Sequence, residues 1–125
     1  MSEKHKILIE SEPFFIKEQS SPEKNRYVFA YTITITNQGD IGARLLTRQW
    51  LITDSNGKIQ EVNGEGVIGQ QPYLKPNEIF RYTSGAILET DVGIMQGQYF
   101  FIDDDGTELV APIPRFTLSI PRILH

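Results

Sequence analysis

Three glycines with the spacing Gly-x-Gly-x-x-Gly, at Gly64, Gly66 and Gly69, form the stretch of this chain whose chemistry is easiest to name. In dinucleotide-binding folds this spacing follows a strand and cradles a pyrophosphate against the N-terminus of a helix. Here the next residues are Gln-Gln-Pro-Tyr-Leu-Lys-Pro-Asn, which hold two prolines and no helical period. The motif lacks the helix that a pyrophosphate site needs, so its glycines require another explanation.

Two explanations of this glycine-rich loop stay open. Successive backbone N–H groups could form an anion site for a phosphate or for a carboxylate of a partner. Alternatively, the glycines supply positive φ angles and close packing where the chain crosses between two sheets. In that second case we expect Val67 and Ile68 to be buried as plugs beneath the loop. Gln71, which follows at once, is a candidate exposed contact.

Arg44, Arg48 and Trp50 are close together in one predicted strand. They could form a stacking or phosphate-binding surface. A single tryptophan in the middle of a sandwich strand is more often a core residue, so we predict that Trp50 is buried. The two arginines are then left to line an exposed groove, where they could serve a nucleotide together with the loop amides.

The residues do not indicate catalysis. His5 and His125 are the only histidines, both stand near chain ends, where we expect poor order, and the chain has no cysteine. The carboxylates show no pattern that would bring a pair into one pocket. We therefore predict that the protein is not an enzyme and carries no cofactor.

Metal binding has one candidate, the run Asp103-Asp104-Asp105-Gly106. A calcium loop alternates its ligands and ends in a distant glutamate, whereas Glu108 here is too near. We predict a solvated hairpin turn and no metal site. Direct sensing of Mg²⁺ or Co²⁺ by this turn is the alternative.

Composition limits the class of protein. With 125 residues we expect one domain spanning 1–125, and the net charge of −4 argues against nucleic-acid binding. The longest apolar run, Tyr27–Tyr31, is far shorter than the roughly twenty residues of a membrane span. The run Ile7–Ile9 is too short for a signal-peptide core, and cysteine is absent. These features predict a cytoplasmic protein without membrane insertion.

Alternation of apolar and polar residues dominates the chain and predicts strands. Residues 27–35 place aromatic and isoleucine side chains on one parity and threonines on the other, and 44–54 continue with Leu46, Trp50 and Ile52. Arg48 shares that parity, which predicts a bulge or a snorkelling arginine. We also expect Pro13 to split the first strand and Ser84-Gly85 to end the one that begins at Ile79. The last strand should be interrupted or at an edge because of its prolines.

Seven to nine short strands and no helical stripe predict an all-β fold, an antiparallel two-sheet β-sandwich. A closed barrel is the alternative.

The chain resembles the ApaG family over nearly its whole length. Six segments in order carry the resemblance: Phe29–Ile33 with Asn37; Leu45–Asp54; Gly64–Pro72; Phe80–Gly85; Gly93–Tyr99; and Ile113–Leu118. Asn77 departs from the family by standing where a glycine is usual. The resemblance implies a fibronectin type III-like, immunoglobulin-like sandwich in a stand-alone bacterial protein. Similar domains in eukaryotic F-box proteins and in a polymerase-delta-interacting protein are thought to recognise other proteins.

The family name is linked to cobalt resistance and magnesium efflux, without an established enzymatic activity. We therefore predict a non-enzymatic module that binds an unidentified protein partner through the loop Gly64–Gly69, with an indirect role in cation homeostasis. The alternative is a protein that binds a nucleotide or pyrophosphate with the same loop and with Arg44 or Arg48. Oligomeric state is left open.

Overall fold

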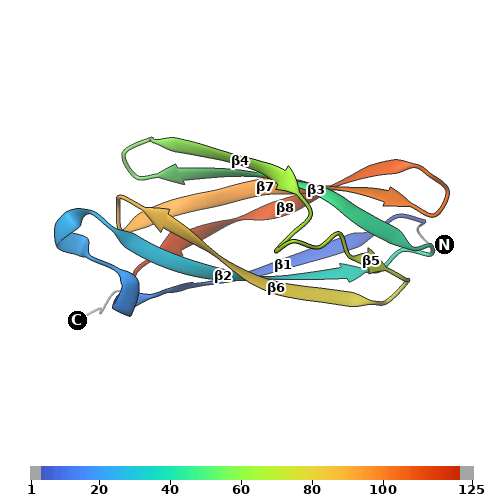
Figure 1. The fold of residues 1–125 in the computed structure, drawn as a ribbon, viewed down its shortest axis with the longest axis horizontal. Coiled ribbons are helices and arrows are strands. Elements are labelled where there is room, and N and C mark those ends of the chain that lie inside the picture. Colours follow the sequence, from blue (N-terminus) through green and yellow to red (C-terminus); the bar gives the residue numbers. More distant parts are fainter. Residues whose placement is uncertain (1–3, 122–125) are drawn as a thin grey trace.

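The computed structural model describes residues 4–121, and most of them lie in strands of two facing sheets (Figure 1). Two short 3₁₀ turns, η1 (Lys17–Gln19) and η2 (Pro22–Lys24), lie between the first and second strands. The strands are β1 (Ile7–Phe15), β2 (Tyr27–Asn37), β3 (Ala43–Asp54), β4 (Ile59–Glu65), β5 (Tyr73–Leu74), β6 (Ile79–Leu88), β7 (Val92–Asp103) and β8 (Glu108–Ser119).

The sheets have the orders β1-β2-β6 and β4-β3-β7-β8, with the short β5 pairing with β3, and every pairing is antiparallel. This confirms the predicted sandwich of fibronectin type III and immunoglobulin type, in which two sheets enclose a core of inward-facing side chains. The barrel alternative is wrong, because each sheet has its own edges.

Alternation in β2 gives the core its centre. Phe29, Ile33 and Ile35 are completely buried, whereas the threonines between them are half-exposed on the outer face. β-Branched residues favour such a pleated, half-buried strand. From the other sheet Trp50 packs edge-on against Tyr31, with ring centroids 5.4 Å apart, which confirms that Trp50 is a core residue.

β3 contains the predicted bulge, at Leu46. Leu45 pairs with Phe101 and Thr47 with Phe100, so Leu46 is an extra residue in the ladder. The bulge reverses the parity of the strand, and the fully buried leucine is Leu45 rather than the predicted Leu46. Arg48 remains on the inner parity and is half-buried.

Two predicted interruptions are wrong, and the prediction for the last strand is confirmed. β1 runs unbroken through Pro13, because an edge strand can direct the missing N–H away from its neighbour. β8 is an edge strand, as its prolines predicted, and it runs through Pro112 and Pro114. β6 also continues through Ser84-Gly85, where Gly85 pairs with Ala30 and so stays in the ladder.

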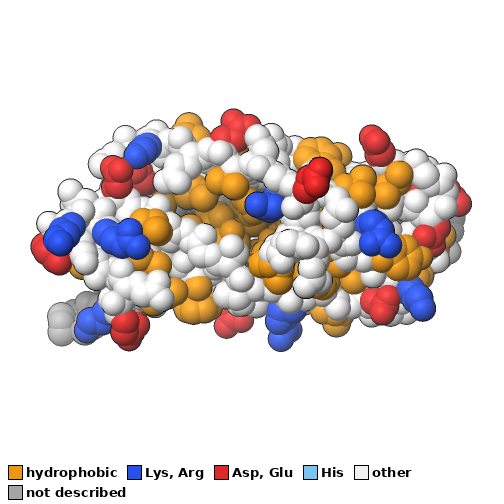
Figure 2. All heavy atoms as spheres, viewed as in Figure 1, with side chains coloured by type: hydrophobic (Ala, Val, Ile, Leu, Met, Phe, Trp, Pro, Cys, Tyr) orange, Lys and Arg blue, Asp and Glu red, His pale blue; other side chains and the backbone are white. Residues whose placement is uncertain are grey.

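The sandwich has one covered side and one open side. On the covered side β1 lies against β8. On the open side β4 and β6 are edge strands, and the segment from β4 to β5 runs along this side (Figure 1). Because β4 and β5 both pair with β3, the expected crossing between the two sheets does not occur in this segment. Figure 2 shows apolar side chains in a hollow in the middle of this face, below β4. Within residues 4–121 no helix is long and apolar enough to cross a membrane.

Candidate functional site

The glycine-rich loop begins later than predicted, because Gly64 belongs to β4 and lies opposite Arg48 of β3. The loop proper starts at Gly66, which has φ +62° and whose N–H donates to Leu46 O at 2.7 Å. A side chain on Gly66 would collide with the backbone carbonyl of Gln70. Gly66 is therefore required for backbone geometry, as the packing explanation proposed.

Residues 67–70 form a two-residue hairpin turn. Val67 N–H donates to Gln70 O at 2.8 Å, and Gln70 N–H donates to Val67 O at 2.9 Å. The two residues between them, Ile68 and Gly69, have φ +43° and +78°. Positive φ at both central positions defines a type I′ turn, for which Asn-Gly is the preferred pair.

The two apolar residues of this turn behave differently. Val67 is completely buried, so it is the predicted plug beneath the loop. The same prediction for Ile68 is wrong: its side chain is 55% exposed at the tip of the turn. A β-branched residue in the left-handed region is a conformational outlier. The conformational cost of this backbone angle is not offset by burial of the side chain, because the side chain is directed to solvent.

Both candidate arginines hold the loop from β3. Arg48 Nη1 donates to the carbonyls of Glu65 and Gly66, at 3.1 and 2.8 Å. Arg44 Nη1 donates to Gln71 O at 2.8 Å, and its guanidinium lies 5.5 Å from the ring centre of Tyr73. The guanidinium groups are thus engaged by loop carbonyls rather than free in a groove.

Gln71 completes this arrangement from the loop side. Its Nε2 donates to Leu46 O at 3.0 Å, the same carbonyl that accepts Gly66 N–H. The carbonyl of Leu46, at the bulge, therefore accepts hydrogen bonds from two donors of the loop. All six predicted site residues meet in this region: Arg44, Arg48, Gly64, Gly66, Gly69 and Gln71.

The loop lacks the surroundings of a dinucleotide site. The N–H groups of Gly66, Val67 and Gln70 donate to carbonyls of the chain itself. After the loop comes the two-residue strand β5, so the helix N-terminus that would face a pyrophosphate is replaced by sheet. The expectation that the motif match is formal is confirmed on this point.

A buried tyrosine pair lies behind Arg48. The hydroxyls of Tyr82 and Tyr99 share a short hydrogen bond across the two sheets. Burial raises the pKa of both hydroxyls, and the neighbouring Arg48 guanidinium opposes that rise. Burial also raises the pKa of Tyr31, against a lowering by a hydrogen bond with Ser84 and by Arg48. This cluster is a polar link within the core rather than an accessible acid–base site.

The aspartate run forms the predicted hairpin turn, and its carboxylates make more hydrogen bonds and ion pairs than expected of a solvated turn. Asp103 is buried and accepts N–H bonds from Asp105 and Thr107, at 2.8 and 2.9 Å. It also contacts His5 Nε2, so the expectation that His5 lies in a poorly ordered end is wrong. His125 lies outside the described residues.

The next two carboxylates of the turn are engaged as well. Asp104 accepts Gly42 N–H at 3.0 Å and the Tyr73 hydroxyl at 2.8 Å, while Asp105 pairs with Lys4 at 2.6 Å. The turn thus ties the N-terminal segment and β5 to the end of β7. No group of three or more His, Asp or Glu side chains placed to hold a metal ion occurs within residues 4–121.

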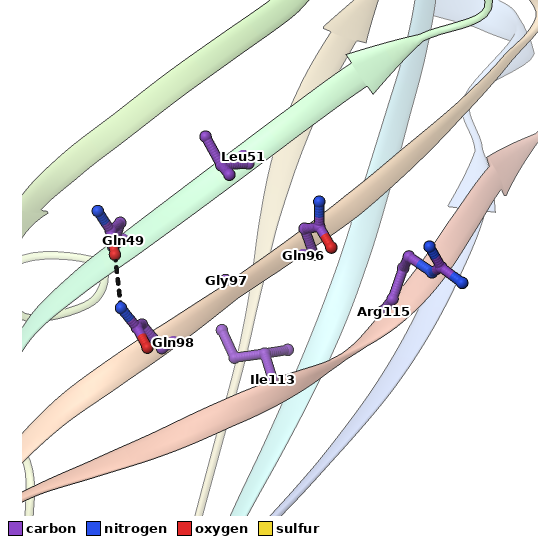
Figure 3. A pocket seen from close by; sticks show the side chains of 7 residues that line it. All are labelled: Gln49, Leu51, Gln96, Gly97, Gln98, Ile113 and Arg115. Carbon is purple, nitrogen blue, oxygen red and sulfur yellow. Dashed lines mark hydrogen bonds between the residues drawn. The ribbon is translucent and has the colours of Figure 1, made fainter.

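The outer face of the larger sheet has a shallow hollow of about 280 Å³ around Gly97 (Figure 3). Glutamines 49, 96 and 98 and Arg115 surround it, and Gln98 Nε2 donates to Gln49 Oε1 at 2.7 Å (Figure 3). Two of the three amides therefore already satisfy one another. The hollow is open, and Leu51 and Ile113 line it together with the polar side chains, so its lining selects no one class of ligand.

Residues 17–103 match the family model of the ApaG domain. The chain belongs to the ApaG domain family. Protein ApaG of Xanthomonas euvesicatoria pv. vesicatoria (strain 85-10) is 52% identical over 122 residues, 98% of this chain and 96% of that protein. Protein ApaG of Xanthomonas campestris pv. campestris (strain B100) is 53% identical over the same coverage. A crystal structure of a Bordetella pertussis protein described as ApaA is similar, with TM-score 0.95 and 42% identity, over 98% of this chain and 100% of that one.

Sequence reasoning about this ApaG domain missed two residues of the site. Ile68 was expected in the core, although the pair Ile68-Gly69 stands where a type I′ turn takes Asn-Gly. Gly69 signals the turn, and the hydrogen bonds between Val67 and Gln70 show it. His5 was dismissed by its place in the chain, and only the fold reveals its partner Asp103.

Proposed function

We propose that this ApaG domain is a non-enzymatic protein-binding module, and that the loop 66–71 with Ile68 at its tip is the contact surface. The observation that supports it is the conformation of Ile68. An isoleucine with φ +43° costs roughly 1–2 kcal/mol relative to a residue suited to the left-handed region. Strained residues of this kind cluster at ligand contacts and active sites.

The support around Ile68 suits a rigid contact. Val67 anchors the turn from below, and Arg48, Arg44 and Gln71 fix the backbone on both sides. A preorganised loop loses little conformational freedom on binding, so an exposed isoleucine on it can contribute its full apolar area. Recognition loops on rigid sandwich scaffolds work in this way.

The experiment compares Ile68→Asn with the parent chain. Asparagine is suited to this turn, so the variant should keep or gain stability while it loses the apolar tip. A partner isolated with the parent chain should bind Ile68→Asn at least about tenfold more weakly, the equivalent of about 1.4 kcal/mol. Equal binding by the two proteins would overturn the proposal. Ile68→Val, which keeps an apolar tip, should bind nearly as well as the parent.

Nucleotide or pyrophosphate binding is the competing proposal, and the residues that could serve it are Arg44, Arg48 and the N–H groups of Ile68 and Gly69. It has less support because the arginines and the other loop amides are engaged within the chain. Titration of pyrophosphate and ATP into ¹⁵N-labelled protein separates the two. Saturable shifts confined to residues 64–71 would favour the anion site.

Any part in cobalt resistance or magnesium efflux would, in this proposal, be exerted through the partner protein. The carboxylates of the aspartate turn serve His5, Lys4, Tyr73 and backbone amides, which accounts for their presence without a cation. Replacing Asp103 and Asp105 together with asparagine should leave the affinity of the protein for Mg²⁺ and Co²⁺ unchanged. A loss of affinity would show direct sensing.

A further inference from the structure

We propose that the outer edge of β4 receives an extended segment of a partner protein, which adds a strand to the larger sheet and carries basic residues at two positions four apart. This inference rests on the proposed protein-binding function, and it assigns the adjoining edge and the chemistry of the partner.

The backbone of β4 shows which groups are available. Asp54 N–H donates to Lys58 O at one end of the β3–β4 ladder, and Gly66 N–H donates to Leu46 O at the other. Bonded and non-bonded pairs alternate along an antiparallel ladder, so the even-numbered residues of β4 face β3. The N–H and C=O groups of Ile59, Glu61 and Asn63 and the N–H of Glu65 consequently point away from the sheet, while Glu65 O also accepts a hydrogen bond from Arg48 Nη1 at 3.1 Å. Within residues 4–121 no strand pairs with this edge.

The other edges of the sandwich are protected. β1 and β8 contain prolines and lie against each other. On β6, Ile87 O accepts a hydrogen bond from Gln60 Nε2 at 3.5 Å, which places a side chain across that edge. β4, with the sequence Ile-Gln-Glu-Val-Asn-Gly-Glu, has no proline, lysine or bulge between its bounds. Proline, lysine and bulges are among the features by which proteins prevent edge pairing, so the protection left on β4 is the negative charge of Glu61 and Glu65.

The side chains of β4 define the partner. Glu61, Asn63 and Glu65 share the outer face of the sheet with Ile59, which is 63% exposed, while Val62 is 37% exposed on the inner parity. Opposite charges across a pair of strands stabilise it. An incoming strand is therefore best matched by Lys or Arg across from Glu61 and Glu65, with apolar residues between them to meet Val62 and Gly64.

A second copy of this chain fits the edge poorly. A two-fold pairing of β4 with itself centred on Glu61 places two Glu61 side chains opposite one another. A pairing centred on Asn63 places Glu61 opposite Glu65. A pairing centred on Val62 places Glu61 opposite Asn63 and Glu65 opposite Ile59, so the glutamates meet no cation in any of these registers. Like charges directly opposite destabilise a strand pair, and the chain already has a net charge of −4. The charge pattern points to a basic partner strand instead.

The test uses the full chain and the peptide Ac-Lys-Val-Thr-Val-Lys-amide, whose lysines match Glu61 and Glu65 in antiparallel register. At millimolar peptide, amide hydrogen exchange should slow at the outward residues 61, 63 and 65, and should change little at 59, which the peptide does not reach, and at 60, 62 and 64. The peptide Ac-Glu-Val-Thr-Val-Glu-amide should leave all of them unchanged. No slowing with the lysine peptide, or equal slowing with both, would overturn the inference.

Asn63→Pro supplies the matched variant. It removes an N–H that points away from β3, so the ladder within the protein is kept. Binding of the lysine peptide should fall about tenfold or more, whereas Asn63→Ala, which keeps that N–H, should bind like the parent. Equal binding by Asn63→Pro would show that the edge is not used. A partner lost by Ile68→Asn but kept by Asn63→Pro would leave the loop function standing and remove the edge from it.

Discussion

The guanidinium group of Arg48 occupies the space that a side chain at Gly64 would fill. A Cβ built on Gly64 would lie 2.8 Å from both terminal nitrogens of Arg48, which is directly opposite on β3. The absence of a side chain at 64 thus lets the arginine reach past β4 to the carbonyls of Glu65 and Gly66. The first glycine of the motif thus makes room for an arginine of the same chain.

This relationship predicts different costs for two glycine substitutions. Gly64→Ala displaces only the end of a flexible side chain, so the free energy of unfolding should fall by less than about 1.5 kcal/mol. Gly66→Ala places a side chain against the Gln70 carbonyl in a left-handed conformation, and should cost more than about 2 kcal/mol. Urea denaturation followed by Trp50 fluorescence measures both. The reverse order of stability would refute the assignment of Gly66 as the structural glycine.

Ile68→Asn should stabilise the protein although it removes an apolar side chain. Asparagine tolerates positive φ and with Gly69 completes the preferred type I′ pair, so we expect a gain of about 1 kcal/mol. The midpoint of urea denaturation should rise at an unchanged m-value. Ile68→Val is the control and should stay within about 0.5 kcal/mol of the parent. A destabilised Ile68→Asn would mean that Ile68 contributes packing after all.

The sequence allowed the architecture to be predicted because alternation is a local signal. The alternation in residues 27–35 predicts one buried face. The pair Asn56-Gly57 is typical of a hairpin turn, and it lies between β3 and β4. Interruptions were overestimated because proline is read as a strand breaker without knowledge of which strands lie at edges. Pro13 is tolerated because β1 lies at an edge, which only the sheet order shows, whereas an edge position was expected for the proline-containing last strand.

The sequence indicated which residues lie around the loop, but not which atoms their side chains bond to. The residues Arg44, Arg48 and Gln71 were expected to face a ligand, yet they bond to backbone carbonyls of the loop and of the bulge. The sequence does not show whether a side-chain donor will bond to a ligand or to a carbonyl of its own chain. The direction of each side chain depends on the bulge at Leu46, whose position emerges from pairing with β7.

The hydroxyl pair of Tyr82 and Tyr99 should be strongly coupled. Either single change to phenylalanine leaves one buried hydroxyl without its partner and should cost about 1–3 kcal/mol. The double change removes both groups, so its cost should be clearly less than the sum of the singles. Urea denaturation of the parent, the two single variants and the double variant gives the four free energies of this double-mutant cycle. Additive costs would show that the two hydroxyls do not interact energetically.

The same pair predicts loss of stability at alkaline pH. Burial raises the pKa of both tyrosines in the folded protein, so the folded state holds protons that the unfolded state releases above its ordinary pKa near 10. The free energy of unfolding should therefore decline as the pH rises above about 10. The Tyr82→Phe/Tyr99→Phe double variant should decline less steeply. An equal slope for both proteins would assign the effect to other groups.

Asp103 predicts that the free energy of unfolding falls as the pH falls, which is the opposite direction from the effect of the tyrosine pair. Burial alone would raise the pKa of this carboxyl, but hydrogen bonds from Thr107 N–H, His5 and Asp105 N–H hold it below its usual value. Its contribution to stability is complete above the unfolded pKa near 4 and is lost as the pH falls through the lowered folded value. Asp103→Asn should reduce stability at neutral pH and flatten the decline below about pH 4. An unchanged acid profile in this variant would contradict the assignment.

The bulge in β3 has a consequence for insertions and deletions. Because Leu46 is an extra residue, β3 carries two alternations of opposite phase, with Ala43 and Leu45 buried before it and Trp50 and Ile52 buried after it. Deletion of residue 46 would restore a regular ladder and at the same time turn Ala43 and Leu45 to the solvent face. The side chain at position 46 is half-exposed and can vary, whereas the residue itself cannot be removed without reversing half of the strand.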